Sequence, residues 1–498
     1  MDYSQFLAMK QEIGLLVVFL LVFFYDLFMP ERTRKSLPGF TAICMTALTV
    51  LSFFACSGCF FCLGASGDVS AFGGMYETTP VINAIKNILN IGVVIVLIQS
   101  AKWADSMPMA LRRGEFYMLM LVTLFGMYLM ISARHFLLFV IGLECASLPL
   151  AAMVALDKNR YESQEAAVKY ILTAVFSTAV FMLGLSFVYG LTGSLYFRSI
   201  YMAITGANSV LLIVALAFVM AGIGFKLSLV PFHLWTADVY QGAPTSVTSY
   251  LSVISKGATA FAFLVIFFQA FGCLYNQVWE WMLYALIILT ITVGNLFALR
   301  QRNMKRFLAF SSISQAGYIM LGVIGNNTMG VAALMYYILV YIFSNLAAFG
   351  VIQAIENYSG KVSMDDYKGL SKTNPRLAFC MMLAMFSLAG IPPFAGFFSK
   401  FFIFTSAINA GSTAIYVLVL IALINTIISL YYYLLVVKAM YISNDECKIE
   451  RFKSTGGERL GLVITVGGVM FLGLVSPVYN WLLDITQNAP SLLAWFIN

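Results

Sequence analysis

The sequence predicts an all-α fold, that of a polytopic membrane protein with about 14 transmembrane helices. Hydrophobic residues make up 61% of the 498 residues and charged residues only 10%, whereas a soluble domain is nearer a quarter charged. Apolar runs of roughly 20 residues, long enough to cross a bilayer, recur along the chain. The sequence has no alternating ten-residue pattern of a membrane barrel, so helices are the spanning structure that satisfies the backbone in lipid.

The apolar runs follow one another with short loops between them. In chain order they lie at 13–29, 39–63, 80–101, 116–133, 136–156, 165–191, 208–235, 243–271, 278–299, 304–325, 329–356, 376–408, 412–440 and 460–485. The first follows MDYSQFLAMKQE, which lacks the basic start and the small-residue cleavage site of a signal peptide. We therefore expect the first run to be retained as a span.

The positive charges indicate how these spans are oriented. Of the 29 Lys and Arg residues, 21 fall in one set of alternate loops and only Lys10, Arg134 and Arg198 in the other. Because cation-rich loops stay in the cytoplasm, this bias places both termini on the outer side. The net charge of +7 is spread over these loops, which argues against a nucleic-acid partner.

A few ionisable residues lie inside the apolar runs, where a charge costs about 2.5–3.5 kcal/mol on insertion scales. They are Lys86, Lys169, Lys226, Lys256, Lys400 and Glu144. Lys86 is close to the start of its span, so we expect its amine to snorkel to the interface. Lys169 is compatible equally with a structural and a functional role. The other four are far from their span ends and are predicted to be functional.

Two of the spans are interrupted beside such a lysine. Pro231 follows Lys226 by five residues, and LAGIPPFAGFFSKFF places Pro392 and Pro393 shortly before Lys400. Simple proline kinks are the alternative, but a kink needs no lysine beside it. Interrupted helices in corresponding halves of a membrane protein are typical of inverted repeats with a site near the midplane.

This spacing divides the chain into four parts. We expect an N-terminal three-helix segment at 1–115, five-helix units at 116–271 and 277–441, and a cytoplasmic loop with a last helix at 442–498. Each interruption falls in the fourth span of its unit. Because five is odd, two consecutive units insert with opposite topology, as in an alternating or relay transporter.

Proton exchange is the chemistry that suits buried lysines. Burial favours the neutral amine and a nearby carboxylate favours the ammonium, so Glu144 and Lys226 could form a switch. The sequence does not establish that the two are neighbours. His233 could relay a proton, or it could hydrogen-bond an unwound turn.

A cysteine array is the strongest competing signal. Cys56, Cys59 and Cys62 have the spacing that begins a ferredoxin-type cluster run, but the fourth cysteine and the proline of that pattern are missing. We interpret them as packed or free thiols and expect no metal site. GIGFK at Gly222 to Lys226 lacks the full phosphate-loop pattern, so we expect no nucleotide site.

Three motifs resemble a known family. They are GFKLSLVPFHLWTADVYQGAPTSVTSYLSVISK (Gly224 to Lys256), KRFLAFSSISQAGY (Lys305 to Tyr318) and LAGIPPFAGFFSKF (Leu388 to Phe401). They closely resemble the antiporter-like membrane subunits of respiratory complex I, and the similarity covers about 115 to 440. Subunits of multisubunit cation/proton antiporters and of membrane-bound hydrogenases are the alternatives.

The resemblance implies a role for each deep residue. Glu144 matches the carboxylate of the family's fifth helix, and Lys226 the lysine of the first broken helix, with which it pairs. Lys256 matches the central lysine that passes protons to the second half, and Lys400 the lysine nearest the exit. The position equivalent to Glu144 in the second half is Gln315, so the second half lacks an obvious switch of its own.

The resemblance also implies a setting. The chain would be a proton-translocating subunit of NADH:quinone oxidoreductase, with NADH, FMN, iron–sulfur clusters and quinone in partner subunits and no cofactor of its own. Its partners would be other membrane-arm subunits and lipids, in a hetero-oligomer. The animal mitochondrial form lacks the first three helices, so their presence here favours a bacterial inner membrane.

Overall fold

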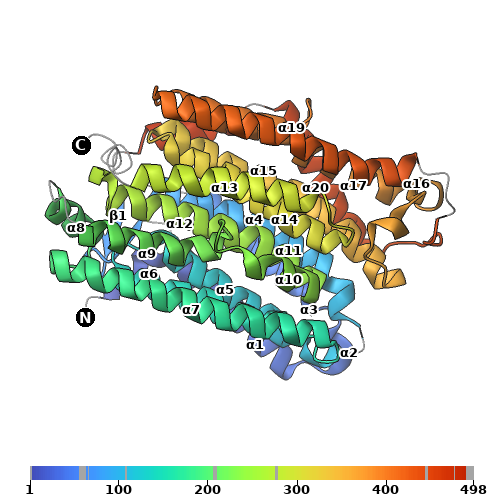
Figure 1. Cartoon of the computed structure of the whole chain (residues 1–498). Helices are drawn as coiled ribbons and strands as arrows, with labels where there is room; N and C mark the ends of the chain where they lie inside the picture. Colours follow the sequence, from blue (N-terminus) through green and yellow to red (C-terminus); the bar gives the residue numbers. More distant parts are fainter. Residues whose placement is uncertain are drawn as a thin grey trace.

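The apolar runs of the sequence form long α-helices that lie side by side in one bundle (Figure 1). The structure is a computed structural model. It describes residues 3–54, 63–64, 67–106, 109–205, 210–274, 279–442, 447–475 and 477–489.

The described residues contain 12 helices long and apolar enough to cross a membrane. The apolar helix Leu37–Phe53 adds one more span, and Pro375–Ala389 followed by Ala395–Ile408 adds a second, interrupted one. The total is the 14 spans that hydropathy predicts, and the all-α membrane fold is confirmed.

The helices are numbered in chain order as in Figure 1. Those of the first half are α1 (Lys10–Phe28), α2 (Glu31–Arg34), α3 (Leu37–Phe53), α4 (Pro80–Ala104), α5 (Arg113–Ser132), α6 (Phe136–Val154), α7 (Tyr161–Thr192), α8 (Phe197–Ile204), α9 (Val210–Leu227), α10 (Leu234–Gly242), α11 (Thr245–Tyr250) and α12 (Lys256–Gln269). Those of the second half are α13 (Glu280–Ala298), α14 (Met304–Ile324), α15 (Thr328–Ser359), α16 (Leu370–Thr373), α17 (Pro375–Ala389), α18 (Ala395–Ile408), α19 (Thr413–Tyr441), α20 (Gly456–Leu474) and α21 (Pro477–Gln487).

A short β-hairpin covers one end of the bundle. Strands β1 (Val69–Ala71) and β2 (Tyr76–Thr78) pair antiparallel, with Ser70 opposite Glu77. Tyr76 also bridges to Ala133, at the end of α5. We call this the hairpin end, and the opposite end, which carries α10, the α10 end (Figure 1).

The bundle is buried at its centre and apolar at its edges. Helices α12, α14 and α15 are buried almost throughout, whereas α7 and α19 lie along opposite edges in Figure 1. The outward faces of these two helices carry large apolar side chains such as Phe176 and Ile427. Such faces suit lipid or neighbouring membrane subunits rather than water.

Small residues allow neighbouring helices to approach closely. A Cβ atom on Gly126 of α5 would lie 2.4 Å from the backbone nitrogen of Ala146 of α6. A Cβ atom on Gly294 of α13 would lie 2.8 Å from the backbone nitrogen of Ser314 of α14. Close backbone packing of this kind is typical of membrane helices, which associate by van der Waals contact. It fixes α6 and α14, the helices that carry Glu144 and Gln315.

Candidate functional site

The first interrupted span is α9 followed by α10, and the chain unwinds between Leu227 and Leu234. Ser228 lies in the left-handed region with φ +61°, which is costly for a residue other than glycine. Three backbone N–H groups of the break find partners. Ser228 donates to the Phe225 carbonyl (2.9 Å), Leu229 to the Gly224 carbonyl (2.8 Å) and Val230 to Thr290 Oγ1 (2.9 Å). The break is therefore held by hydrogen bonds rather than left open.

Lys226 is buried in the last turn of α9, directly before this break. Its Nζ donates to Ser147 Oγ of α6, and Ser147 in turn donates to the Leu143 carbonyl at 2.6 Å. Glu144 lies less than one turn before Ser147 on α6, and among the described residues it forms no ion pair with Lys226. A neutral hydroxyl, rather than the Glu144 carboxylate, thus contacts the lysine.

His233 directly precedes α10, in the unwound stretch between the two half-helices. Its two possible roles, proton relay and hydrogen bonding to the unwound turn, both remain predictions. The ring Nδ1 is buried and has no hydrogen-bond partner among the described residues.

Lys256 begins α12 at the centre of the bundle, directly after a π-helical turn, η3 (Leu251–Ser255). Its buried Nζ donates to Ser312 Oγ of α14 at 2.8 Å and lies 5.4 Å from the centre of the Tyr240 ring. π-turns are rare and are often found at functional sites. The cation is held by a hydroxyl and an aromatic face, both of them uncharged.

Lys400 lies in the second turn of α18, after the second break. Its buried Nζ donates to the carbonyls of Leu388 and Ala389, both at 3.0 Å, and lies 5.2 Å from the Tyr318 ring centre. These are the last carbonyls of α17, which the break frees from helical hydrogen bonds. Freed backbone carbonyls therefore accept the hydrogen bonds of the Lys400 amine.

Two glycines make this arrangement possible. Gly390 ends α17 with φ +87°, and a Cβ atom there would lie 3.1 Å from Lys400 Cδ. A Cβ atom on Gly396 would lie 1.7 Å from the Ser387 carbonyl oxygen. The two half-helices meet this closely only because both positions lack a side chain.

Gln315, the counterpart of Glu144 in the resemblance, lies beside the Lys400 site. Its Nε2 is 3.4 Å from the Leu388 carbonyl and 3.2 Å from the Tyr433 hydroxyl, and the Tyr337 hydroxyl donates to its Oε1. Gln315 and Lys400 also line a small cavity, about 10 Å³ of which is open to the centre of a water molecule. That is room for about one water.

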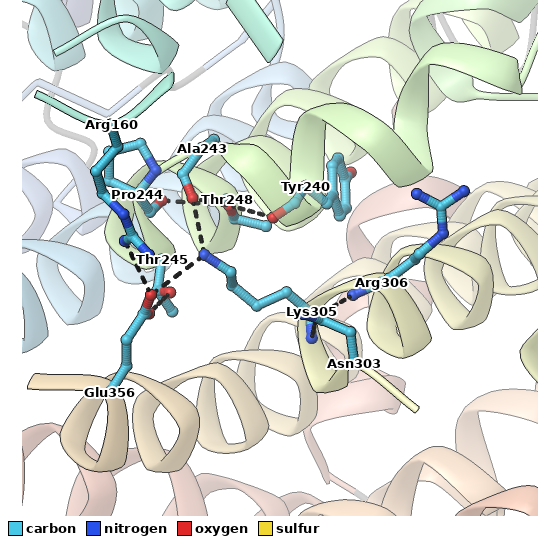
Figure 2. Close-up of polar contacts among 10 residues, drawn as sticks. All are labelled: Arg160, Tyr240, Ala243, Pro244, Thr245, Thr248, Asn303, Lys305, Arg306 and Glu356. Carbon is cyan, nitrogen blue, oxygen red and sulfur yellow. Dashed lines mark hydrogen bonds and ion pairs between the residues drawn. The ribbon is translucent and has the colours of Figure 1, made fainter. Parts of the chain in front are cut away.

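An ion pair near the α10 end is buried, and the sequence analysis did not predict it (Figure 2). Lys305 Nζ contacts Glu356 Oε1 at 3.4 Å and donates to the Ala243 carbonyl at 3.1 Å. Arg160 approaches the same carboxylate at 3.3 Å, and Thr245 donates to it. The sequence analysis counted Lys305 among the 21 cations of the cation-rich loops. Its position inside the apolar run 304–325 was the feature of the sequence that indicated burial.

Lys86 corrects a sequence prediction. We expected its amine to snorkel, but the side chain is fully buried and its Nζ lies 2.6 Å from Glu12 Oε1. The prediction was wrong because the partner lies 74 residues earlier, at the start of α1. Lys169 instead lies at a partly exposed position, 2.7 Å from Asp238 and 2.8 Å from Glu165.

The cysteine array Cys56, Cys59 and Cys62 lies outside the described residues. The five described cysteines are free thiols. Among the described residues, no group of three or more His, Cys, Asp or Glu side chains could hold a metal ion.

Comparisons with known proteins extend these observations. The profile of the family described as NADH:quinone oxidoreductase/Mrp antiporter, TM, matches residues 133–429. A protein of Phocaeicola vulgatus named NADH-quinone oxidoreductase subunit N is 50% identical over 97% of this chain and 99% of its own length.

Two solved structures share the fold. A chain of respiratory complex I from Thermus thermophilus is 31% identical, covers 93% of this chain and 97% of its own, and superposes with a TM-score of 0.76. A chain of the Mrp complex from a Dietzia species reaches a TM-score of 0.78 over 98% of this chain and 96% of its own. At 19% identity, that likeness concerns the fold alone.

Proposed function

This chain belongs to the NADH-quinone oxidoreductase subunit N family, and we propose that, as a proton-translocating membrane-arm subunit of complex I, it moves protons through Lys226, Lys256 and Lys400. It is a multi-pass membrane protein of the bacterial enzyme. The stretch VPFHLWTADVYQGAP resembles subunit N in particular, and the identity along the whole chain confirms that resemblance.

One observation carries the proposal. All three lysines are buried, and each Nζ contacts neutral oxygens: Ser147 for Lys226, Ser312 for Lys256, and two backbone carbonyls for Lys400. A carboxylate in direct contact favours the ammonium form of a lysine, whereas burial beside neutral groups favours the neutral amine. Each lysine can therefore accept a proton and release it again.

In the proposed relay, a proton passes from one ammonium to the neutral amine of the next lysine, with bridging hydroxyls or water between them. Glu144 controls the first step, because its negative charge favours the ammonium form of Lys226. Movement of α6 relative to α9 would change that influence. His233 is included as a further proton-carrying candidate, beside the break that Lys226 precedes.

The alternative is a subunit of a multisubunit cation/proton antiporter. The 50% identity to a complex I subunit over nearly the whole chain favours the complex I assignment. The likeness to the Mrp chain is one of fold. We further propose that NADH, FMN, the iron–sulfur clusters and quinone are bound by other subunits, with which this chain forms a hetero-oligomer in the inner membrane.

We also propose two inverted five-helix units at 116–271 and 277–441, after a three-helix segment at 1–115 and before a cytoplasmic loop and last helix at 442–498. In support, α7 and α15 both have 32 residues and both end at a left-handed glycine, Gly193 or Gly360. The charge bias puts the hairpin end and both termini on the outer, periplasmic side. A C-terminal tag that protease reaches only from the cytoplasmic side would refute this orientation.

The relay is tested at Lys256, with Lys169 as a matched control. Lys256→Ala should leave the complex assembled but reduce proton pumping and quinone reduction by about a hundredfold, as expected when a proton carrier is lost. Lys256→Arg should be equally inactive, because arginine does not release its proton. Lys169→Ala, which removes a partly exposed lysine, should keep most activity. A Lys256→Ala complex that pumps normally would refute the relay.

A further inference from the structure

The Glu12–Lys86 pair has no part in the relay above, yet it is among the most deeply buried charges of the molecule. Lys86 Nζ lies 2.6 Å from Glu12 Oε1, with side-chain exposures of 0% and 1%. The Tyr76 hydroxyl donates to Glu12 Oε2 at 2.9 Å and lies 3.3 Å from Lys86 Nζ. The Tyr76 and Tyr128 ring centres are 5.5 Å and 5.3 Å from that nitrogen.

A purely structural role explains this pair poorly. Taking two charges out of water costs several kcal/mol per ion, and their attraction often does no more than offset that cost. The neighbouring helices have ample apolar residues with which to pack. Buried ionisable residues in membrane helices are functional candidates for this reason.

A cavity at the hairpin end has Glu12 among its lining residues. It is lined by Glu12, Gln11 and Lys10 of α1, by residues of β1 and β2, and by Gly64, and about 370 Å³ is open to water centres. Gln11 donates to Asn87 at 3.2 Å, but its Oε1 is buried without a hydrogen-bond partner among the described residues. An unpartnered acceptor beside Glu12 is the kind of group that ordered water satisfies.

Polar groups continue from Lys86 towards the centre of the bundle. The Tyr128 hydroxyl donates to Asn90 Oδ1, one turn further along α4, and Asn90 Nδ2 is buried without a partner among the described residues. At Gly92, α4 packs against Ile254 of η3, two residues before Lys256. The pair thus lies between this cavity and the helices of the proposed relay.

We propose that Glu12 and Lys86 form a proton-exchange site that connects the chain with the aqueous phase at the hairpin end. This inference rests on the proposed relay and adds an outlet to it. A proton passes from the Lys86 ammonium to Glu12, leaving an amine and a carboxylic acid. The acid then gives its proton to cavity water as hydronium, and the amine takes a proton from the interior, which restores the ion pair.

Other charged residues lie near the Glu12–Lys86 pair. Arg134 pairs with Glu77 at 3.0 Å at the same end of the bundle, and Lys10 lines the cavity. The Glu77 carboxylate is partly exposed and does not line the cavity at Glu12. It therefore provides a matched control carboxylate.

The first experiment replaces the pair by neutral groups of similar size. In Glu12→Gln/Lys86→Gln the two amides can hydrogen-bond, so the complex should assemble and proton pumping in membrane vesicles should fall by about threefold, a barrier change below 1 kcal/mol. Glu77→Gln should pump like the wild type. A double variant that assembles and pumps like the wild type overturns the proposal.

The second experiment uses the wild-type complex and does not depend on the folding of a variant. A water-soluble carbodiimide with glycine ethyl ester, applied from the hairpin side of sealed vesicles, should modify Glu12 and reduce pumping, as peptide mass spectrometry and a pumping assay would detect. Modification of Glu77 but not of Glu12 would show that water does not reach the site, and the proposal would fail.

The Lys256→Ala variant separates this inference from the relay. If Lys256→Ala is inactive while the Glu12/Lys86 double variant pumps normally, the outlet is refuted and the relay stands. If Lys256→Ala pumps normally, the relay itself is refuted.

Discussion

The two interrupted spans hold their lysines by different chemistry. Lys226 precedes its break and donates to a side chain, Ser147, on a helix that also carries Glu144. Lys400 follows its break and donates to two main-chain carbonyls of its own span. A side chain can move or change its charge, whereas the backbone carbonyls are fixed. The first site is therefore suited to control, and the second to holding and releasing a proton at a constant position.

The local backbone explains how each site is built. At the first break, Ser228 adopts a positive φ despite its side chain, and hydrogen bonds to neighbouring groups hold the turn. At the second break, Gly390 and Gly396 allow α18 to lie against the end of α17. The second site therefore depends on the absence of side chains, and the first does not.

The largest expected effect follows from this difference. Gly396→Ala should abolish assembly, because its Cβ would lie 1.7 Å from a backbone oxygen that has nowhere to move. Gly224→Ala near the first break should assemble, because its Cβ would lie 3.2 Å from the Phe232 ring and 3.8 Å from Leu229 Cβ, and no backbone atom would be closer. Native gels of membrane extracts would measure both, and equal amounts of assembled complex would contradict the comparison.

Charge substitution at Lys400 is expected to have the next largest effect. Both Lys400→Ala and Lys400→Arg should assemble and lose about a hundredfold in coupled pumping, since neither side chain can bind and release a proton there. Quinone reduction and proton pumping in vesicles are the measurements. A structural lysine predicts the opposite for arginine, so an active Lys400→Arg complex would exclude the proton-carrier role.

A smaller effect is expected at Glu144, because it acts on Lys226 without contact. Glu144→Gln should lower coupled pumping by about tenfold, the effect of some 1.4 kcal/mol on the barrier. Glu144→Asp keeps the charge and should retain part of the activity. Full pumping by an assembled Glu144→Gln complex would remove the proposed switch.

The smallest loss of pumping is expected when the Ser147 hydroxyl, which accepts the Lys226 hydrogen bond, is removed. Ser147→Ala should lower pumping by about fivefold or less, since the change removes one hydrogen bond, which contributes about 1 kcal/mol. If the loss equals that of Lys226→Ala, Ser147 is itself part of the proton path rather than a support.

Local features of the fold were predictable from sequence, and long-range pairs were not. Apolar length fixed the spans, and the prolines beside Lys226 and Lys400 marked both interruptions, because each signal lies within one stretch of chain. Glu12 and Lys86 lie at the ends of two different spans, where charge is ordinarily tolerated. Their contact depends on how α1 and α4 are placed in the folded bundle, which no local pattern encodes. The same holds for Lys305 and Glu356.

The π-turn η3 has a consequence for the rotational register of the central span. A π-turn accommodates one residue more than the α-helix it interrupts, and each residue turns an α-helix by about 100°. The extra residue changes the rotation of α11 about the helix axis relative to α12. Thr245 of α11 donates to Glu356, and Lys256 of α12 donates to Ser312. Removing a single residue from Leu251–Ser255 would keep the span helical and membrane-embedded, yet turn one of these two contacts away from its partner.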